Sequence, residues 1–212
     1  YSRKKFREEL SLVEDLNWQN LNAEQLEEEY SPSSVIGGNY LPFINEYIKR
    51  SDDVASSNII IECFYGPMQS NSVDLILPEN TPKDKPVPLL VFLHGGYWQE
   101  LSKKESLFAA KDILSEGIAF AAVDYTLCPH VTIREIVDEC IRALRYLKSI
   151  GSKYNFDPNK IVLAGSSAGA HLASMCVLEA MKAKDNSSLR IASTILVSGV
   201  YELEPIIQTS IN

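Results

Sequence analysis

The chain has 212 residues, of which 45% are hydrophobic and 23% are charged, with a formal net charge of −8 and an isoelectric point near 5.0. These values are ordinary for a soluble globular protein, and the length predicts a single domain over residues 1–212 with a substantial buried core. The acidic balance argues against nucleic acid or an anionic membrane as a partner.

The first 50 residues have helical composition and carry many charges. A proline-containing turn at residues 31–34 and a glycine pair at residues 37–38 interrupt them, which predicts two or three short helices joined by turns. Asn22 is placed to cap the first helix, and apolar residues between 41 and 48 follow a helical spacing. We expect residues 1–50 to pack over one edge of a sheet, and a cap that faces the substrate is the alternative.

The rest of the chain is predicted to contain six strands, at residues 59–64, 73–77, 89–93, 118–123, 161–163 and 191–197. Ser102 and Thr132 each begin a capping box and therefore predict the starts of two helices. Gly117 and Gly151 predict their ends. Strands and helices alternate from residue 89 onward, which predicts an α/β fold with a mostly parallel central sheet and helices on both faces.

The most informative stretch is the sequence G-S-S-A-G at residues 165–169, which lies between a short apolar strand and a helix-forming segment. A strand that turns through G-x-S-x-G into a helix is a nucleophile elbow, with Ser167 at the tip of the turn. The two glycines are expected because side chains there would collide with neighbouring backbone. The amide of Ala168 is expected where an oxyanion would form. A chance match in a loop is the alternative, and the strand and helix around the motif favour catalysis.

A second motif, H-G-G-Y-W, follows the third predicted strand at residues 94–98. Gly95 and Gly96 let the backbone approach the carboxyl edge of the sheet, where their amides and that of Tyr97 can complete an oxyanion hole. Tyr97 and Trp98 are placed to border a substrate pocket, with core packing as the equal alternative. Two such motifs in this order favour a serine hydrolase.

These motifs resemble those of the kynurenine formamidases (arylformamidases), a family with the α/β-hydrolase fold. Residues 94–98 match the H-G-G-x-W signature of that family. Further similarities lie at residues 29–32, 65–67, 74–75, 124–129, 165–171, 198–201 and 203–205. The elbow is shared with many esterases, and residues 124–129 also resemble the hormone-sensitive-lipase-like group. The tryptophan of the glycine motif is the feature that favours a formamidase.

The resemblance implies hydrolysis of the formamide of N-formyl-L-kynurenine to kynurenine and formate, in tryptophan degradation. Ser167 would be the nucleophile, the backbone amides would form the oxyanion hole, and no metal or organic cofactor would be required. The resemblance also implies the chain order serine, acid, histidine, with the last two residues after two further strands. Because this sequence ends at Asn212, we expect the triad acid and histidine and the C-terminal strands to be absent from it.

None of the three histidines fits the role of the general base. His171 lies one helical turn beyond Ser167 and is expected to be packed and hydrogen-bonded. His94 is expected to order the glycine turn, and His130 to lie on the surface. Two other functions remain open: a general carboxylesterase that uses the same residues, and a hydrolase-like scaffold that binds a partner without catalysis.

Cysteine usage and hydropathy bear on the cellular compartment. The four cysteines form no C-x-x-C pair and are widely spaced, at Cys63, Cys128, Cys140 and Cys176. This pattern predicts reduced, mostly buried thiols rather than a disulfide framework or a zinc site. No apolar run reaches membrane-spanning length and no signal-peptide pattern is visible, so we expect a cytoplasmic protein with a small-molecule substrate. A leader before Tyr1 is not excluded, and a homodimer remains open.

Overall fold

The computed structural model of the chain describes residues 17–79, 81, 84–182 and 189–211. These residues belong to two compact units. The larger unit, Phe43–Val200, contains the sheet and every candidate site residue. The smaller unit combines the residues up to Pro42 with the segment from Tyr201 onward. The single domain predicted over residues 1–212 stays a prediction.

The smaller unit is built from short helices: η1 (Trp18–Asn20), α2 (Ala23–Tyr30), η2 (Ser34–Ile36) and η4 (Glu204–Gln208). The side chain of Asn22 accepts a hydrogen bond from the amide of Gln25 at 2.9 Å, and the Gln25 side chain accepts one from the Asn22 amide, so the predicted cap is confirmed. Ser210 holds the later segment against α2, because its amide and hydroxyl both donate to the carboxylate of Glu27, at 2.7 and 2.6 Å.

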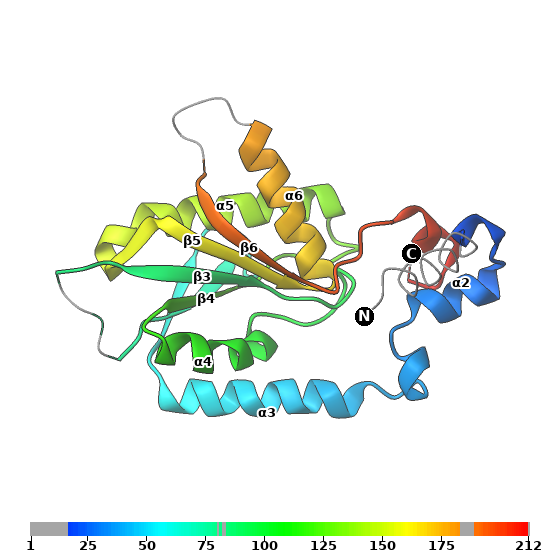
Figure 1. Cartoon of the computed structure of the whole chain (residues 1–212), viewed down its shortest axis with the longest axis horizontal. Helices are drawn as coiled ribbons and strands as arrows, with labels where there is room; N and C mark the ends of the chain where they lie inside the picture. Colours follow the sequence, from blue (N-terminus) through cyan, green and yellow to red (C-terminus); the bar gives the residue numbers. More distant parts are fainter. Residues whose placement is uncertain (1–16, 80, 82–83, 183–188, 212) are drawn as a thin grey trace, which may run out of the picture. The chain divides into compact units, whose positions relative to one another are not determined.

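The larger unit contains a six-stranded sheet in the order β1-β2-β4-β3-β5-β6 (Figure 1). Its strands are β1 (Ile60–Phe64), β2 (Ser72–Ile76), β3 (Val87–Leu93), β4 (Ala119–Val123), β5 (Phe156–Ser166) and β6 (Ile191–Val197). The last four strands run parallel, β2 pairs antiparallel with β4, and β1 pairs antiparallel with β2, so the mostly parallel sheet is confirmed. After β3 the chain builds β4 on one side and then crosses to build β5 on the other side. The carboxyl ends of β3 and β5 therefore flank a point where the strand order reverses, which is where open α/β sheets bind ligands.

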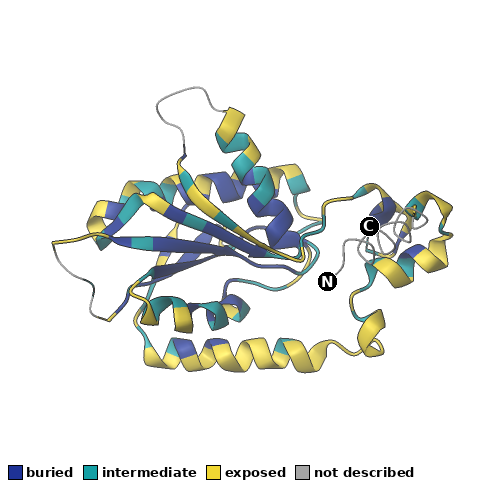
Figure 2. Ribbon diagram, in the orientation of Figure 1, coloured by how far each residue is buried: buried dark blue, intermediate teal, exposed yellow. Residues whose placement is uncertain are grey.

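Helices cover both faces of this sheet, as predicted. Figure 1 shows α5 (Ile133–Tyr154) and α6 (Ala168–Lys182) on one face, and α3 (Leu41–Ser57) and α4 (Ala110–Ser115) on the other. The central strands are buried on both sides (Figure 2). Because alternate side chains of a strand point to opposite faces, burial on both faces requires the continuous apolar run seen in β3.

Helix α3 contains the predicted amphipathic stretch and packs on the sheet. Val54 belongs to the same apolar cluster as Ile76 of β2 and Leu90 of β3, so this helix lies against a face of the sheet rather than over an edge. Residues 1–16 lie outside the described residues, and the packing predicted for the other residues before α3 stays a prediction.

The helix between β3 and β4 begins differently from the prediction. A 3-10 helix, η3 (Lys104–Ala109), precedes α4, and its cap residue makes no side-chain capping bond, so a capping box at Ser102 is wrong. The hydroxyl of Ser102 donates to the carboxylate of Glu105 at 2.6 Å and accepts from the amide of Lys104 at 3.2 Å, not from that of Glu105. Gly117, with φ of +73°, follows the end of α4 as predicted.

Helix α5 begins at the predicted capping box, in which the Thr132 and Glu135 side chains bond each other's backbone amides. Its predicted end at Gly151 is wrong, because the helix continues to Tyr154 and is capped by Asn155 in the left-handed conformation. Gly151 serves a tertiary contact instead. A β-carbon there would lie 2.9 Å from the carbonyl oxygen of Phe156, so the glycine permits β5 to start close to the helix.

Candidate active site

Ser167 lies at the tip of the turn that joins β5 to α6, as the motif predicts. Its φ of 55° is in the left-handed region, a conformation that costs a non-glycine residue about 1–3 kcal/mol and is concentrated at functional sites. Its amide donates to the carbonyl oxygen of Val197 in β6 at 2.8 Å, and its carbonyl oxygen accepts from the amide of Ala170 at 3.0 Å. The main chain on both sides therefore holds the serine in this strained position.

The glycines that flank the elbow allow three pieces of backbone to meet. A β-carbon on Gly165 would collide with the carbonyl oxygen of Gly169. A β-carbon on Gly169 would collide with the carbonyl oxygens of Leu93 and His94, at the end of β3. The predicted reason for both glycines is therefore confirmed.

The glycine turn at residues 94–98 lies directly beside the elbow. A β-carbon on Gly95 would lie 3.0 Å from the carbonyl oxygen of Ser166 and 3.3 Å from Cβ of Ser167, so the two motifs face each other at one end of the sheet. Gly96 has φ of 93°, and the next two residues, Tyr97 and Trp98, are also left-handed. The amide of Ala168 follows Ser167 directly in the sequence. The role of this amide and of those of residues 95–97 as oxyanion donors stays a prediction.

The two aromatic residues of the turn differ in burial. Trp98 is only 3% exposed and packs in the interior, while Tyr97 is half-buried. Their rings meet edge to face, with centroids 6.0 Å apart. The indole of Trp98 is therefore part of the core and does not border an open pocket. Tyr97 remains the candidate for substrate contact.

His94 is buried and orders the glycine turn, as expected from the sequence. Its Nδ1 atom lies 2.9 Å from the Gly95 carbonyl oxygen, to which it can bond only as a donor. Its ring stacks on Tyr125 at 4.0 Å, and the Tyr125 hydroxyl donates to the His94 carbonyl oxygen at 2.7 Å. Burial raises the pKa of Tyr125 well above its ordinary value, so this donor keeps its proton. His94 Nε2 lies 3.4 Å from the Asp124 carboxylate.

Sequence reasoning did not assign this supporting role to Asp124 and Tyr125, although both lie in the stretch 124–129 that resembles the formamidases. They follow β4, the neighbour of β3, which explains how they reach the turn. The hydroxyl of Tyr65 donates to the Asp124 carbonyl oxygen at 2.6 Å and fixes the end of that strand.

The other two histidines form no hydrogen bond with the serine hydroxyl among the described residues. His171 is buried one turn along α6, and burial lowers its pKa below the ordinary value of 6.5. It is packed as expected, but its Nδ1 atom has no hydrogen-bond partner among the described residues. His130 lies exposed in a turn, as expected. Within the described part of the chain, no side chain hydrogen-bonds to the hydroxyl of Ser167.

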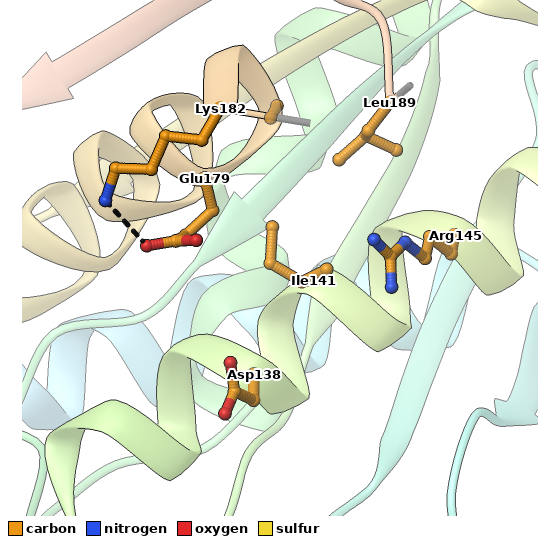
Figure 3. A pocket seen from close by; sticks show the side chains of 7 residues that line it. Asp138, Ile141, Arg145, Glu179, Lys182 and Leu189 are labelled. Carbon is orange, nitrogen blue, oxygen red and sulfur yellow. Dashed lines mark hydrogen bonds and ion pairs between the residues drawn. The ribbon is translucent and has the colours of Figure 1, made fainter. Parts of the chain in front are cut away.

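A cavity of about 340 Å³ lies between α5 and α6, away from Ser167. Its lining residues are Asp138, Ile141, Arg145, Glu179, Ala180, Lys182 and Leu189 (Figure 3). Figure 3 shows Lys182 paired with Glu179, at 3.1 Å. Glu179 lies twelve residues beyond Ser167 on one helix, which corresponds to about 18 Å at 1.5 Å per residue. This cavity is therefore separate from the elbow.

The described part of the chain holds no group of three His, Cys, Asp or Glu side chains that could bind a metal ion. None of the described helices combines the length and the apolar character needed to cross a membrane. All four cysteines are free thiols; Cys128 is half-buried and the other three are buried.

Comparison with known proteins gives the family. The BD-FAE family model matches residues 73–208. The kynurenine formamidases of Danio rerio and Salmo salar are each 32% identical over 92% of this chain, which spans 67% and 66% of their lengths. The solved structure of a bacterial heroin esterase superposes with a TM-score of 0.65 at 25% identity, over 86% of this chain and 57% of that one. By these matches and by the architecture of the sheet, the chain belongs to the BD-FAE family and to the kynurenine formamidase family of α/β-hydrolases.

Proposed function

We propose that this protein is a serine hydrolase that removes the formyl group of N-formyl-L-kynurenine, giving kynurenine and formate. The observation that carries the proposal is the position of Ser167, in a left-handed turn between β5 and α6, where a β-carbon added to Gly95 would lie 3.3 Å from its Cβ. The proposed substrate comes from the names of two relatives, which are kynurenine formamidases. This chain spans about two thirds of the length of each.

In the proposed reaction, the Ser167 hydroxyl attacks the formyl carbon and gives its proton to a general base. The amides of Ala168 and of residues 95–97 bind the oxyanion, and one such donor is typically worth about 3 kcal/mol in the transition state. The base returns the proton to the departing arylamine, and water then releases formate from the formyl-serine. The resemblance implies that the base is a histidine paired with an acid.

The close approach of the glycine turn supports a small acyl group. A β-carbon added to Gly95 would lie 3.3 Å from Cβ of Ser167, so a side chain on the turn would crowd the serine. A formyl group presents only a hydrogen atom on that side, whereas longer acyl groups need space there. We also propose a cytoplasmic location and a small-molecule substrate, with no nucleic acid or membrane partner, which the net charge of −8 supports. A homodimer remains open.

A general carboxylesterase is the second candidate. The likeness to a heroin esterase over 86% of the chain favours it, because that protein is an esterase by name. The same serine and the same backbone amides would serve either reaction. The ratio of kcat/KM for N-formylkynurenine to kcat/KM for p-nitrophenyl acetate therefore decides between the two substrates.

The proposal is tested on the full-length gene product with a fluorophosphonate probe and with both substrates. We expect the probe to modify Ser167, located by peptide mass spectrometry, and Ser167→Ala to lose hydrolysis by roughly 10⁴-fold or more. Ser166→Ala is the matched control, because this serine is the neighbour in sequence and should leave labelling intact. Absence of labelling at every serine would support the non-catalytic scaffold and overturn the proposal.

A further inference from the structure

Two buried rings join the glycine turn to the helix that carries the elbow. Trp98, in the turn, is 3% exposed, and His171, on α6, is 7% exposed. Their ring centroids lie 5.2 Å apart with planes at 88°, an edge-to-face contact. The indole Nε1 of Trp98 and Nδ1 of His171 both lack hydrogen-bond partners among the described residues. Ring packing, rather than a hydrogen bond, therefore joins these two side chains, beside the close backbone approach of Gly169 to His94.

The turn needs such support because its backbone is strained. Tyr97 and Trp98 have φ of 46° and 62°, a conformation that L-residues rarely adopt without restraint. The carbonyl oxygen of Gly96 accepts from the amides of Gln99 and Glu100, which closes the turn on itself. The amide of Cys128 donates to the Trp98 carbonyl oxygen at 2.8 Å and the Tyr125 hydroxyl to the His94 carbonyl oxygen at 2.7 Å, and both bonds join the turn to the segment after β4.

His171 is tied to the nucleophile by its own backbone. Its amide donates to the Ser167 carbonyl oxygen at 3.2 Å, in the first turn of α6. Because the His171 side chain packs against Trp98 from this position, it fixes the distance between the turn and Ser167. Burial also lowers the pKa of His171, so the ring that meets the indole is the neutral imidazole at neutral pH.

We propose that Trp98 and His171 are a pair of positioning residues whose ring contact holds the oxyanion turn in register with Ser167. Neither side chain touches the reacting atoms. The catalytic consequence rests on the proposed hydrolase function, whereas the contact itself does not. The two rings hold the turn by packing and not by charge. An aromatic ring without a titratable nitrogen should therefore serve in place of His171.

Kinetic measurements on the full-length gene product test the catalytic consequence. We expect His171→Ala and Trp98→Ala each to lower kcat by roughly 100-fold, the loss typical of a misplacement of about 1 Å, with a much smaller change in KM. His171→Phe should recover most of kcat, and His130→Ala, in an exposed turn, should behave as wild type. The double variant should be no slower than either single variant, since the two rings act as one unit. Additive losses, or a lowered melting temperature with unchanged kcat, would overturn the proposal.

A spectroscopic measurement tests the contact without relying on activity. The protein is labelled with 5-fluorotryptophan, and the ¹⁹F resonance of residue 98 is assigned by its loss in Trp98→Phe. We expect this resonance to shift as His171 takes up a proton in acid, and to lose that response in His171→Phe but not in His130→Phe. A resonance that is the same in His171→Phe and wild type at every pH would contradict the contact. Failure of hydrolysis alone, with the shift present, would count against the proposed function and not against the pair.

Discussion

At the scale of single residues, a few backbone positions decide whether the site can form. The motifs reveal Ser167 and the glycines around it, because a strained turn demands specific residue types at fixed spacing. The support from Tyr125 and the contact of Trp98 with His171 could not be predicted, because these partners are separated by tens of residues and leave no local pattern.

Gly95→Ala tests the closeness of the two motifs. The added β-carbon would lie 3.0 Å from the Ser166 carbonyl oxygen, closer than ordinary contact, so the turn must shift by a few tenths of an ångström. We expect kcat to fall by about tenfold or more, because an oxyanion donor that moves loses much of its effect. Far-ultraviolet circular dichroism should remain that of wild type. An unchanged kcat would show that the turn takes no part in the reaction.

Lys103 provides a prediction about stability and pH. Its ammonium group is buried and donates to Asp74 at 2.7 Å and to Glu62 at 2.6 Å. Burial alone would lower the pKa of Lys103, but these two bonds outweigh burial and raise the pKa above 10.5. Lys103→Met leaves Asp74 unpaired in the interior, and we expect it to lower the free energy of unfolding by about 3–5 kcal/mol at neutral pH.

The sign of the pH dependence follows from the raised pKa of Lys103. The stabilisation is fully present below pH 10.5 and is lost as the pH rises through the folded-state value. Urea unfolding of wild type and Lys103→Met at pH 7 and at pH 11 measures it. We expect the difference between the two proteins to shrink at the higher pH, and a constant difference would contradict the charged role of this lysine.

At the scale of elements, the strands could be predicted and some helix ends could not. Apolar runs mark buried strands well, because a parallel strand covered on both faces must be apolar throughout. The capping box at Thr132 holds, since it depends only on local backbone, while the one expected at Ser102 fails because a 3-10 turn precedes that helix. Gly151 was expected to end α5, but its role comes from contact with β5, which no local pattern encodes.

Thr132→Ala tests the cap of α5. The mutation removes the side-chain acceptor for the amide of Glu135, and we expect the free energy of unfolding to fall by about 1 kcal/mol. Ser152→Ala, at an exposed position in the same helix, is the control and should change stability by less than about 0.5 kcal/mol. Equal effects of the two variants would show that the cap contributes nothing beyond helix propensity.

At the scale of the larger unit, the strand order places the site. β3 and β5 are neighbours in the sheet, so the segments that follow them emerge side by side even though about 70 residues separate them in sequence. The alternation of strands and helices indicated a parallel sheet, and the two motifs indicated which strands carry the chemistry. The substrate and the proton acceptor of Ser167 could not be predicted from these patterns.

The proposed function predicts a narrow acyl site, since a formyl group needs room only for a hydrogen atom beside the carbonyl carbon. We expect kcat/KM for p-nitrophenyl esters to fall from acetate to butyrate by about tenfold or more, because an added methylene that does not fit is typically worth that factor. Initial rates on the full-length gene product measure it. A faster reaction with butyrate would indicate an open acyl pocket and favour the carboxylesterase.

One backbone bond makes β6 a support of the residue that carries the reactive oxygen. The amide of Ser167 is engaged by the carbonyl oxygen of Val197, the last residue of β6. A tilt of that strand would pull directly on the nucleophile, with no side chain as intermediary. Inactivating substitutions should therefore be found along β6 as well as around the scissile bond. Those in β6 would act without contacting the substrate, so a list of substrate-contacting residues would not include them.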